Sequence, residues 1–388
     1  MESGVKGIHQ VWLQACLTAV AFVVIPAALF AQAGDRARAM ALEQKGQNAE
    51  AEQIWSGMAK ADPHNAEALA HLGLLEARRE HYDVAISYYR QALAINPELP
   101  GLQMNLGLAL FKAAQFPDAI KSFTAEIRKR PGDQRLTILL GMAHYGMGDY
   151  LVAIPYLQQA AGQDPQNLPL RMTLAHSCLW SKQYQCVLDV YKEILALNAE
   201  SAEADMLAGE ALDEKGDSAG ATEQFRAAVV ANPKEPNVHF GLGYLLWTQS
   251  QFAEAAKEFQ LELENDPQHT QARTYLADSW VQQNEFTKAL PELEKVVASD
   301  SSQELAHRDL GIVYADAGRK EDAVRELQKA IELDPKDVAP HWRIAKVYQS
   351  MGRKDEAKVE FEKASKMLQE SKQALQEKLE APRPPAAQ

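Results

Sequence analysis

Apolar residues in this chain follow a helical spacing that is interrupted at regular intervals. In residues 66–99, one stretch places apolar or small side chains three to four positions apart, and a second stretch does so after a polar break. These residues are Leu69, Leu72 and Gly73, followed by Ala85, Ile86, Tyr89, Ala92 and Leu93. An apolar residue at every third or fourth position marks one face of an amphipathic helix. The pattern therefore predicts two helices joined by a short turn.

This helical pair repeats with a period of 34 residues. Proline closes most copies, at Pro63, Pro97, Pro131, Pro165, Pro233, Pro267 and Pro335. In the second half of each copy an alanine, replaced once by Val187, is followed four residues later by a bulky residue: Trp55, Tyr89, Phe123, Leu157, Tyr191, Phe225, Phe259, Leu293, Leu327 or Phe361. The first half carries Gly or Ala at Ala39, Gly73, Gly107, Gly141, Ala175, Gly209, Gly243, Ala277, Gly311 and Ala345. Small residues facing bulky ones predict closely packed helices.

These motifs resemble the tetratricopeptide repeat (TPR): a Leu-Gly pair, alanine followed by a bulky group, and a closing Asp/Asn-Pro. The resemblance implies an all-α protein, a right-handed α-solenoid of about ten tandem hairpins. We expect the solenoid over residues 34–371, with a degenerate first repeat that carries Arg38 where the family prefers an apolar residue. A C-terminal capping helix over 372–380 and a disordered tail over 381–388 are expected to follow.

The N-terminus has the pattern of an export signal. Lys6 precedes an apolar stretch over residues 11–30, and Ala31-Gln32-Ala33 follows it. We expect residues 1–33 to be a signal peptide cleaved after Ala33, which predicts a bacterial exported protein, periplasmic or secreted. The alternative is an uncleaved helix over residues 11–30 that attaches the protein to the inner membrane.

Composition and motifs argue against several function classes. The formal charge of −13 disfavours nucleic acid as a partner, because the protein would repel a polyanion. The chain carries no Gly-rich phosphate loop, no His-Glu-x-x-His pattern and no Gly-x-Ser-x-Gly elbow. We therefore predict no catalytic residues, no cofactor, no metal site and no enzymatic activity. His239, His307 and His341 share the fourth position of their repeats, which favours a packing role over metal binding.

Cys178 and Cys186 lie eight residues apart in the fifth hairpin, on either side of its turn. In an oxidising compartment they could form a disulfide. The sequence favours two small apolar residues instead, because it does not show whether the two α carbons come within bonding range.

The family resemblance implies that the first helix of each repeat lines a concave groove. Its inward positions carry large apolar residues in the third to fifth repeats, namely Met104, Leu108, Phe111, Ile138, Met142, Tyr145, Met172, Leu179 and Trp180. The sixth repeat adds the acidic Glu203, Glu210 and Asp213, and the seventh adds Phe240, Tyr244 and Trp247. Exposed apolar side chains typically mark binding surfaces. We predict that these residues bind a partner, and the alternative is that they only pack against the next helix.

The leading hypothesis is a non-catalytic scaffold of the cell envelope that binds a protein or peptide along this groove. TPR proteins that hold chaperone tails use Lys and Asn at positions that are Ala70, Leu74, Met104 and Leu108 here, so that class of partner is disfavoured. The alternatives are a regulatory subunit of an envelope enzyme, such as a glycosyltransferase or peptidase, and a purely structural spacer.

Overall fold

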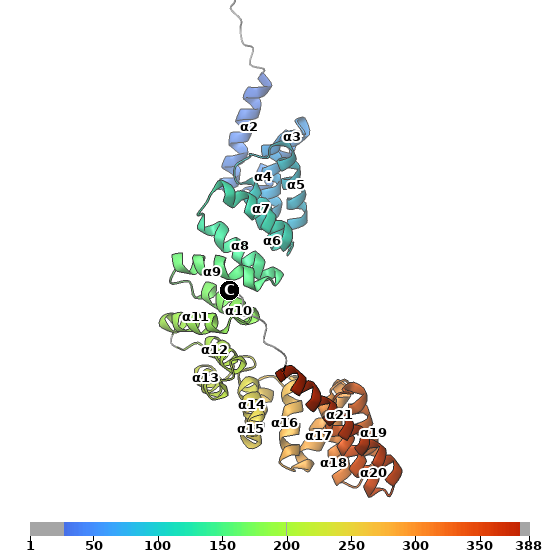
Figure 1. Ribbon diagram of the computed structural model, residues 1–388. Helices are drawn as coiled ribbons and strands as arrows, with labels where there is room; N and C mark the ends of the chain where they lie inside the picture. The colour runs from blue at the N-terminus through green and yellow to red at the C-terminus, as the bar shows by residue number, and fades with distance from the viewer. Residues whose placement is uncertain (1–26, 199, 381–388) are drawn as a thin grey trace, which may run out of the picture. The chain divides into compact units, whose positions relative to one another are not determined.

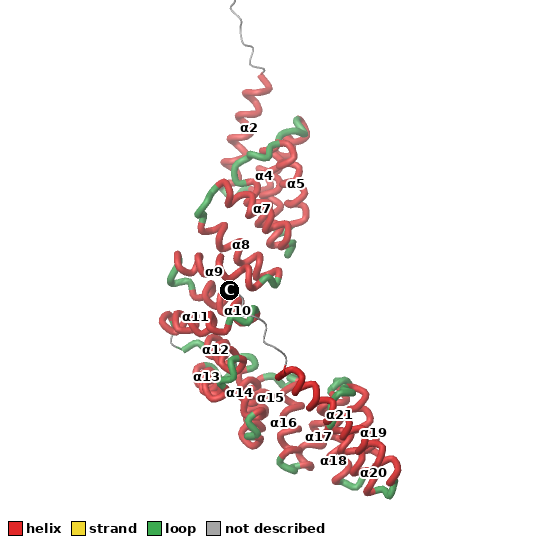
Figure 2. The backbone as a smooth tube through the Cα atoms, in the orientation of Figure 1, coloured by secondary structure: helices red, strands yellow, loops and turns green. Residues whose placement is uncertain are grey.

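The computed structural model describes residues 27–198 and 200–380, and these residues form twenty helices and no strand. Consecutive helices lie side by side as hairpins joined by short loops (Figures 1 and 2). The hairpins group into two compact units, one ending at Gln163 and the other beginning at Asp164. The predicted all-helical stack of about ten hairpins is confirmed.

The first unit contains four hairpins. Its helices are α2 (Ala27–Gln44), α3 (Asn48–Ala61), α4 (Ala66–Arg78), α5 (Tyr82–Ile95), α6 (Leu102–Lys112), α7 (Phe116–Lys129), α8 (Gln134–Met147) and α9 (Tyr150–Gln163).

The second unit contains six hairpins. Its helices are α10 (Leu168–Trp180), α11 (Tyr184–Leu197), α12 (Ala202–Glu214), α13 (Ser218–Ala231), α14 (Val238–Thr248), α15 (Phe252–Asn265), α16 (Thr270–Gln282), α17 (Phe286–Ser299), α18 (Glu304–Asp316), α19 (Lys320–Leu333), α20 (Ala339–Ser350) and α21 (Lys354–Glu380).

Small residues on the first helix of a hairpin receive the bulky residue of the second. Trp55, Tyr89, Phe123 and Phe259 are among the largest fully buried side chains. A Cβ atom added to Gly107 would lie 2.5 Å from Cε1 of Phe123, well inside van der Waals contact. Helix α6 can therefore approach α7 closely only because residue 107 has no side chain.

The turn inside each hairpin has one residue in the left-handed backbone conformation, at the same place in all ten copies. Five of these residues are glycine, and the others are Glu80, Ala114, Lys182, Ser250 and Asn284, with φ between 56° and 64°. Left-handed backbone is costly for any residue with a Cβ atom. The hairpin packing therefore imposes the turn even where the residue opposes it.

A side-chain contact between a basic residue and a glutamate recurs inside the last four hairpins. His239, His307 and His341 are buried, and Nδ1 of each lies 2.6 to 2.7 Å from a glutamate carboxylate 19 residues further along the chain. In the eighth repeat Arg273 takes the place of the histidine and contacts Glu292. These side chains join the two helices of their hairpins, which is the packing role that the sequence favours for the histidines.

The ends of the chain differ in part from the expected organisation. Residues 372–380, expected as a separate capping helix, continue α21 without a break, and the side chains of residues 369–374 are exposed rather than packed on a neighbour. Residues 1–26 of the expected signal or anchor, and the expected tail at 381–388, lie outside the described residues. The division at Gln163 has no counterpart in the sequence, because the 34-residue period continues across it.

Replacing Gly107 by alanine should destabilise the first unit. The new methyl group would clash with the Phe123 ring, and overpacking of this kind typically costs about 1 to 3 kcal/mol. Gly57→Ala is the matched control, because nothing lies within 4 Å of its added Cβ atom, and alanine there should add about 0.4 to 1 kcal/mol of stability. Urea unfolding followed by circular dichroism checks both variants. An equal change in the free energy of unfolding for both variants would show that the contact between α6 and α7 does not exclude a side chain at residue 107.

Replacing Ala114 by glycine should stabilise the same unit. Glycine avoids about 1 to 2 kcal/mol of left-handed strain, partly offset by about 0.4 to 1 kcal/mol of extra chain entropy in the unfolded state. Gly148 occupies the equivalent turn of the next hairpin, and Gly148→Ala should shift the urea midpoint in the opposite direction. A destabilised Ala114→Gly variant would contradict this account of the turns.

Candidate functional site

A pocket in the second unit brings together predicted residues from three repeats. It has a volume of about 470 Å³ and lies between α10, α12 and α14, with contributions from α11, α13 and the turn after α10. We call it the aromatic–acidic pocket. It is lined by Leu179, Trp180, Lys182, Tyr184, Met206, Glu210, Asp213, Glu214, Phe225, Asn237, Phe240, Gly241, Tyr244 and Leu245. Leu179, Trp180, Glu210, Asp213, Phe240 and Tyr244 are among the predicted partner-binding residues.

The walls of the pocket are aromatic and partly open to solvent. The side chains of Trp180 and Tyr244 are 49% and 37% exposed, respectively. Phe225 is buried beneath them, and a Cβ atom on Gly241 would lie 2.1 Å from its ring. A glycine at position 241 thus lets the Phe225 ring lie against α14 at the base of the pocket.

Carboxylates gather on one side of the pocket. Glu210, Asp213 and Glu214 come from α12, and Lys182 is the basic residue that faces them in the lining. The Tyr184 hydroxyl donates a hydrogen bond to Glu214 Oε2 at 3.0 Å. Removal of solvent by the surrounding protein raises the pKa of Glu210, and the charge of Glu214 raises it further. The pocket therefore concentrates negative charge beside apolar rings.

Trp180 is held by a histidine one helical turn earlier. The His176 ring packs against the Trp180 ring with centroids 5.2 Å apart. His176 Nε2 lies 2.9 Å from Glu203 Oε1. Glu203, which was predicted to bind a partner, therefore contacts His176 and does not line the pocket. His176 Nδ1 is buried and has no hydrogen-bond partner among the residues that the structure describes.

The aromatic wall continues away from the pocket along α14 and α16. Tyr275 packs edge-on against Tyr244 and Trp247, with centroids 5.4 and 5.0 Å apart. Trp247 is half-buried, and its Nε1 donates a hydrogen bond to Asp278 Oδ2 at 2.5 Å. Trp247 belongs to this packed cluster rather than to the pocket lining, so its truncation is expected to disturb a buried carboxylate.

Asp278 is part of a buried ionic cluster between α16 and α18. Asp278 and Asp309 are both 0% exposed, and Arg308 contacts them at 3.1 and 3.4 Å. Burial raises the pKa of Asp309 well above its ordinary value, the neighbouring Asp278 raises it further, and Arg308 opposes both. The cluster fixes the inner end of Trp247 through Asp278. Sequence reasoning missed Tyr275, Asp278 and Arg308, because it considered inward positions only in the third to seventh repeats, and these residues belong to the eighth and ninth.

The other predicted residues are half-buried. Met104, Leu108 and Phe111 pack against the core of the first unit. Tyr145 lies edge-on to Tyr150, with centroids 5.7 Å apart. Ile138 and Met142 in α8, and Met172 in α10, are half-buried as well. Their role in partner binding stays a prediction.

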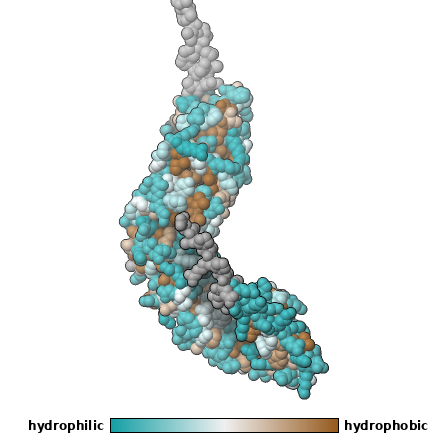
Figure 3. Space-filling view, viewed as in Figure 1, coloured by the Kyte–Doolittle hydropathy of each residue, from teal (hydrophilic) through white to brown (hydrophobic). Residues whose placement is uncertain are grey.

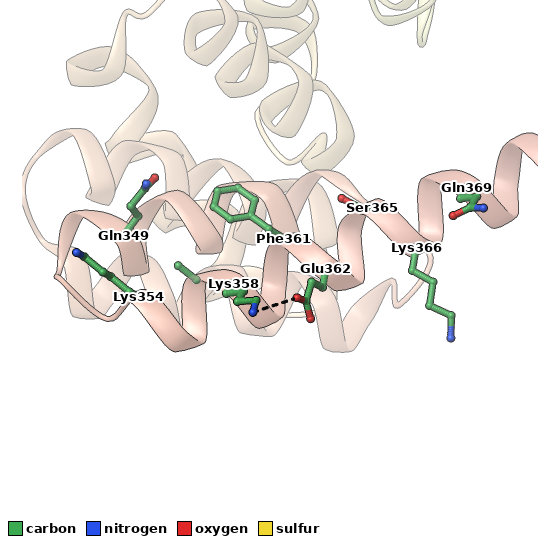
Figure 4. A pocket seen from close by; sticks show the side chains of 9 residues that line it. Gln349, Lys354, Lys358, Phe361, Glu362, Ser365, Lys366 and Gln369 are labelled. Atoms are coloured by element: carbon green, nitrogen blue, oxygen red, sulfur yellow. Dashed lines mark ion pairs between the residues drawn. The ribbon is translucent and has the colours of Figure 1, made fainter.

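Two further hollows lie outside the predicted set. One, of about 410 Å³ in the first unit, includes Ala70, Leu74 and His71, whose ring stacks on Trp55 with centroids 4.3 Å apart. The other, of about 620 Å³, follows α20 and α21 (Figure 4). Its lining is mostly charged or polar, with Phe361 as its aromatic residue. The aromatic–acidic pocket is smaller than the hollow along α20 and α21 but is lined by more apolar residues.

The described residues give no indication of a metal centre or a membrane span. Within residues 27–198 and 200–380, no three His, Cys, Asp or Glu side chains come together as metal ligands. Over the same ranges, no helix has both the length and the hydropathy that crossing a membrane requires. Hydrophobic patches interrupt a mostly hydrophilic surface in the space-filling view (Figure 3).

Comparison with curated proteins finds partial relatives. Over 144 residues the chain is 26% identical to BBSome complex member BBS4 of Xenopus tropicalis, covering 37% of this chain and 28% of that protein. Over 94 residues it is 31% identical to the Mus musculus BBS4, covering 24% and 18% of the two chains. The chain thus spans less than a third of the length of these relatives.

Solved structures show similar repeats at low sequence identity. MamA of Desulfovibrio magneticus matches with a TM-score of 0.40 and 21% identity, covering 44% of this chain and 96% of that one. A tetratricopeptide repeat protein of Parabacteroides merdae matches with a TM-score of 0.46 and 18% identity, covering 64% and 97%. YrrB, described as a TPR protein with an unusual peptide-binding site, matches with a TM-score of 0.40 and 18% identity, covering 48% and 97%.

Family models cover most of the helical region. One model described as tetratricopeptide repeat matches residues 36–100, 104–167, 188–236, 207–270 and 240–304. A TPR repeat model matches 313–352, and a further tetratricopeptide repeat model matches 339–367. The chain belongs to the tetratricopeptide repeat family.

Proposed function

We propose that this protein is a non-catalytic scaffold that binds a peptide or protein partner, and that the aromatic–acidic pocket receives a basic side chain flanked by apolar ones. The observation that carries the proposal is the composition of the pocket: Trp180 and Tyr244 are partly exposed beside Glu210, Asp213 and Glu214. Aromatic residues that combine exposed apolar area with limited flexibility are typical binding anchors.

The charges of the pocket favour a positively charged side chain of the ligand. Three carboxylates face one lysine in the lining, so the local charge favours a cation. An aromatic face attracts a guanidinium or ammonium group through its quadrupole, and a carboxylate adds a charge-assisted hydrogen bond. An arginine or lysine whose neighbours are apolar would use both features at once.

Location in the cell envelope is part of the proposal and rests on the signal-like sequence over residues 1–33. Attachment to a membrane through residues 11–30 is its variant. Regulation of an envelope enzyme on another chain is a second function of the same scaffold, and a purely structural spacer is a third. The pocket favours the binding role over the spacer, because a spacer has no need for exposed aromatic anchors.

Replacing Trp180 or Tyr244 by alanine should weaken binding of a labelled peptide that carries one arginine between leucines. A central interface anchor contributes about 2 kcal/mol or more, which is about 30-fold in affinity. Because both side chains are partly exposed, the melting temperature should change little. Trp247→Ala is the matched control: it removes one hydrogen-bond donor of buried Asp278, so it should lower the melting temperature more than Trp180→Ala does.

Fluorescence anisotropy and thermal melts decide between the outcomes. Unchanged affinity in both the Trp180 and the Tyr244 variants would contradict the pocket as the binding site. A large loss of stability in Trp180→Ala would assign that tryptophan to the core instead.

Binding of the same peptide should weaken as the pH falls. Glu210 attracts a cation only when it is ionised, and its raised pKa means that protonation begins at a higher pH than for an ordinary glutamate, whose value is 4.5. The affinity should therefore be full at neutral pH and decline in mildly acidic solution. Glu210→Gln should bind more weakly at neutral pH and show a flatter pH profile. An unchanged pH profile in Glu210→Gln would contradict the role of Glu210.

A further inference from the structure

One wall of the aromatic–acidic pocket lies inside a loop closed by a disulfide. Cys178, in the last turn of α10, is bonded to Cys186, in the first turn of α11, with the α carbons 5.7 Å apart. The sequence favoured two unbonded apolar residues here, and the structure corrects that expectation: the turn after α10 brings the two side chains together. Leu179, Trp180, Lys182 and Tyr184, which all line the pocket, lie between the two cysteines.

We infer that the Cys178–Cys186 disulfide is a redox control on this pocket, so that its reduction loosens the wall and weakens ligand binding. This inference rests on the proposed binding function of the pocket. The disulfide acts on the side chains that distinguish the pocket, because Trp180 supplies an anchor and Tyr184 holds Glu214.

The disulfide constrains a turn that includes a strained residue. Lys182 has a φ of 60°, a left-handed conformation that is unfavourable for a lysine. Two backbone hydrogen bonds also hold the turn, from Lys182 N to Leu179 O and from Gln183 N to Cys178 O. Once the sulfur–sulfur bond opens, the hairpin packing and these hydrogen bonds still hold the turn, but the residues between the two cysteines lose a covalent constraint and become more mobile. Trp180 and Tyr184 must then be ordered at the moment of binding.

Reduction is expected to leave the fold intact. The other nine hairpins form the equivalent left-handed turn, and in the described residues the Cys178–Cys186 bond is the disulfide of the structure. Helices α10 and α11 therefore pack by the same contacts as hairpins without a cross-link. The effect is confined to the pocket wall, which suits a regulatory change rather than unfolding.

The exchange chemistry is available to a cellular dithiol. Cys178 is 0% exposed, whereas Cys186 is partly accessible. A thiolate of the dithiol attacks Cys186 Sγ, the bond to Cys178 Sγ breaks, and Cys178 takes up a proton as a thiol. The second thiol of the reductant then attacks its own sulfur in the mixed disulfide and releases Cys186, which is protonated in turn. The protein gains two electrons and two protons, and the dithiol becomes a cyclic disulfide.

The test compares the oxidised protein with the protein reduced by dithiothreitol, using the labelled arginine peptide as probe. The reduced protein should bind about tenfold more weakly, because ordering the two aromatic side chains adds to the cost of binding. The double variant Cys178→Ala with Cys186→Ala should bind the peptide with the affinity of the reduced protein. Dithiothreitol should not change the affinity of this variant. Equal affinity of the oxidised and reduced forms would overturn the redox control while leaving the binding function in place.

A ligand-free measurement separates the two proposals. Hydrogen exchange of the backbone amides of residues 179–185 should accelerate on reduction, while exchange in α16 to α19 stays constant. If neither the oxidised nor the reduced protein binds the peptide, the proposed specificity for a basic side chain is wrong. Hydrogen exchange then still shows whether the disulfide restricts the mobility of the pocket wall. Unchanged exchange over 179–185 would overturn the inference even if the double variant failed to fold, because the wild-type protein suffices for this comparison.

Discussion

The whole structure depends on the close approach of two helices within each hairpin. A single hairpin cannot bury its apolar stripe alone, so each one packs against its neighbours, and the fit is set by a small residue facing a bulky one. Gly107 against Phe123 is the clearest case, since a Cβ atom at residue 107 would overlap the ring. The same constraint at every repeat explains why the period of 34 residues holds along the chain. Because these positions fix the scaffold, the inward-facing residues of the first helices can vary without loss of the fold.

In the second unit, the inward-facing positions carry different kinds of residue in different repeats. The inner positions around α12 carry carboxylates and those of α14 carry aromatic rings, and together they enclose the aromatic–acidic pocket. Further along, the inner positions of α16 and α18 hold Asp278 and Arg308, which form an ion pair, and Asp278 also accepts a hydrogen bond from Trp247. One set of positions thus produces an open pocket in one place and a buried polar network in another. A polar network of this kind holds its members in place, because a buried group that loses its partner is costly.

Much of the fold could be predicted from the sequence, because the repeat places every helix and its buried face. The conformation of the turns could not be predicted from residue type alone. Ala114 and Lys182 adopt the left-handed conformation that glycine adopts in other repeats, because packing of the hairpin outweighs the local preference of the residue. Six of the first-helix residues that were predicted to bind a partner line the pocket, and their role in binding stays a prediction. Lys182 and Tyr184 were missed, because the inward positions were counted on first helices, and these residues lie in the turn and on the second helix. The disulfide was not favoured, since a separation of eight residues does not fix a distance.

Trp180 and Trp247 show why position in the repeat does not by itself define a site residue. Both were assigned to the groove by the same rule, yet Trp180 is half exposed in the pocket wall while Trp247 donates to a buried carboxylate. The difference comes from the residues around each ring. Trp180 has His176 on its own helix and an open pocket beyond, whereas Trp247 meets Asp278 of the following repeat. The role of an inward-facing residue therefore depends on the side chains of the neighbouring repeat. A prediction that considers each repeat separately does not include these contacts.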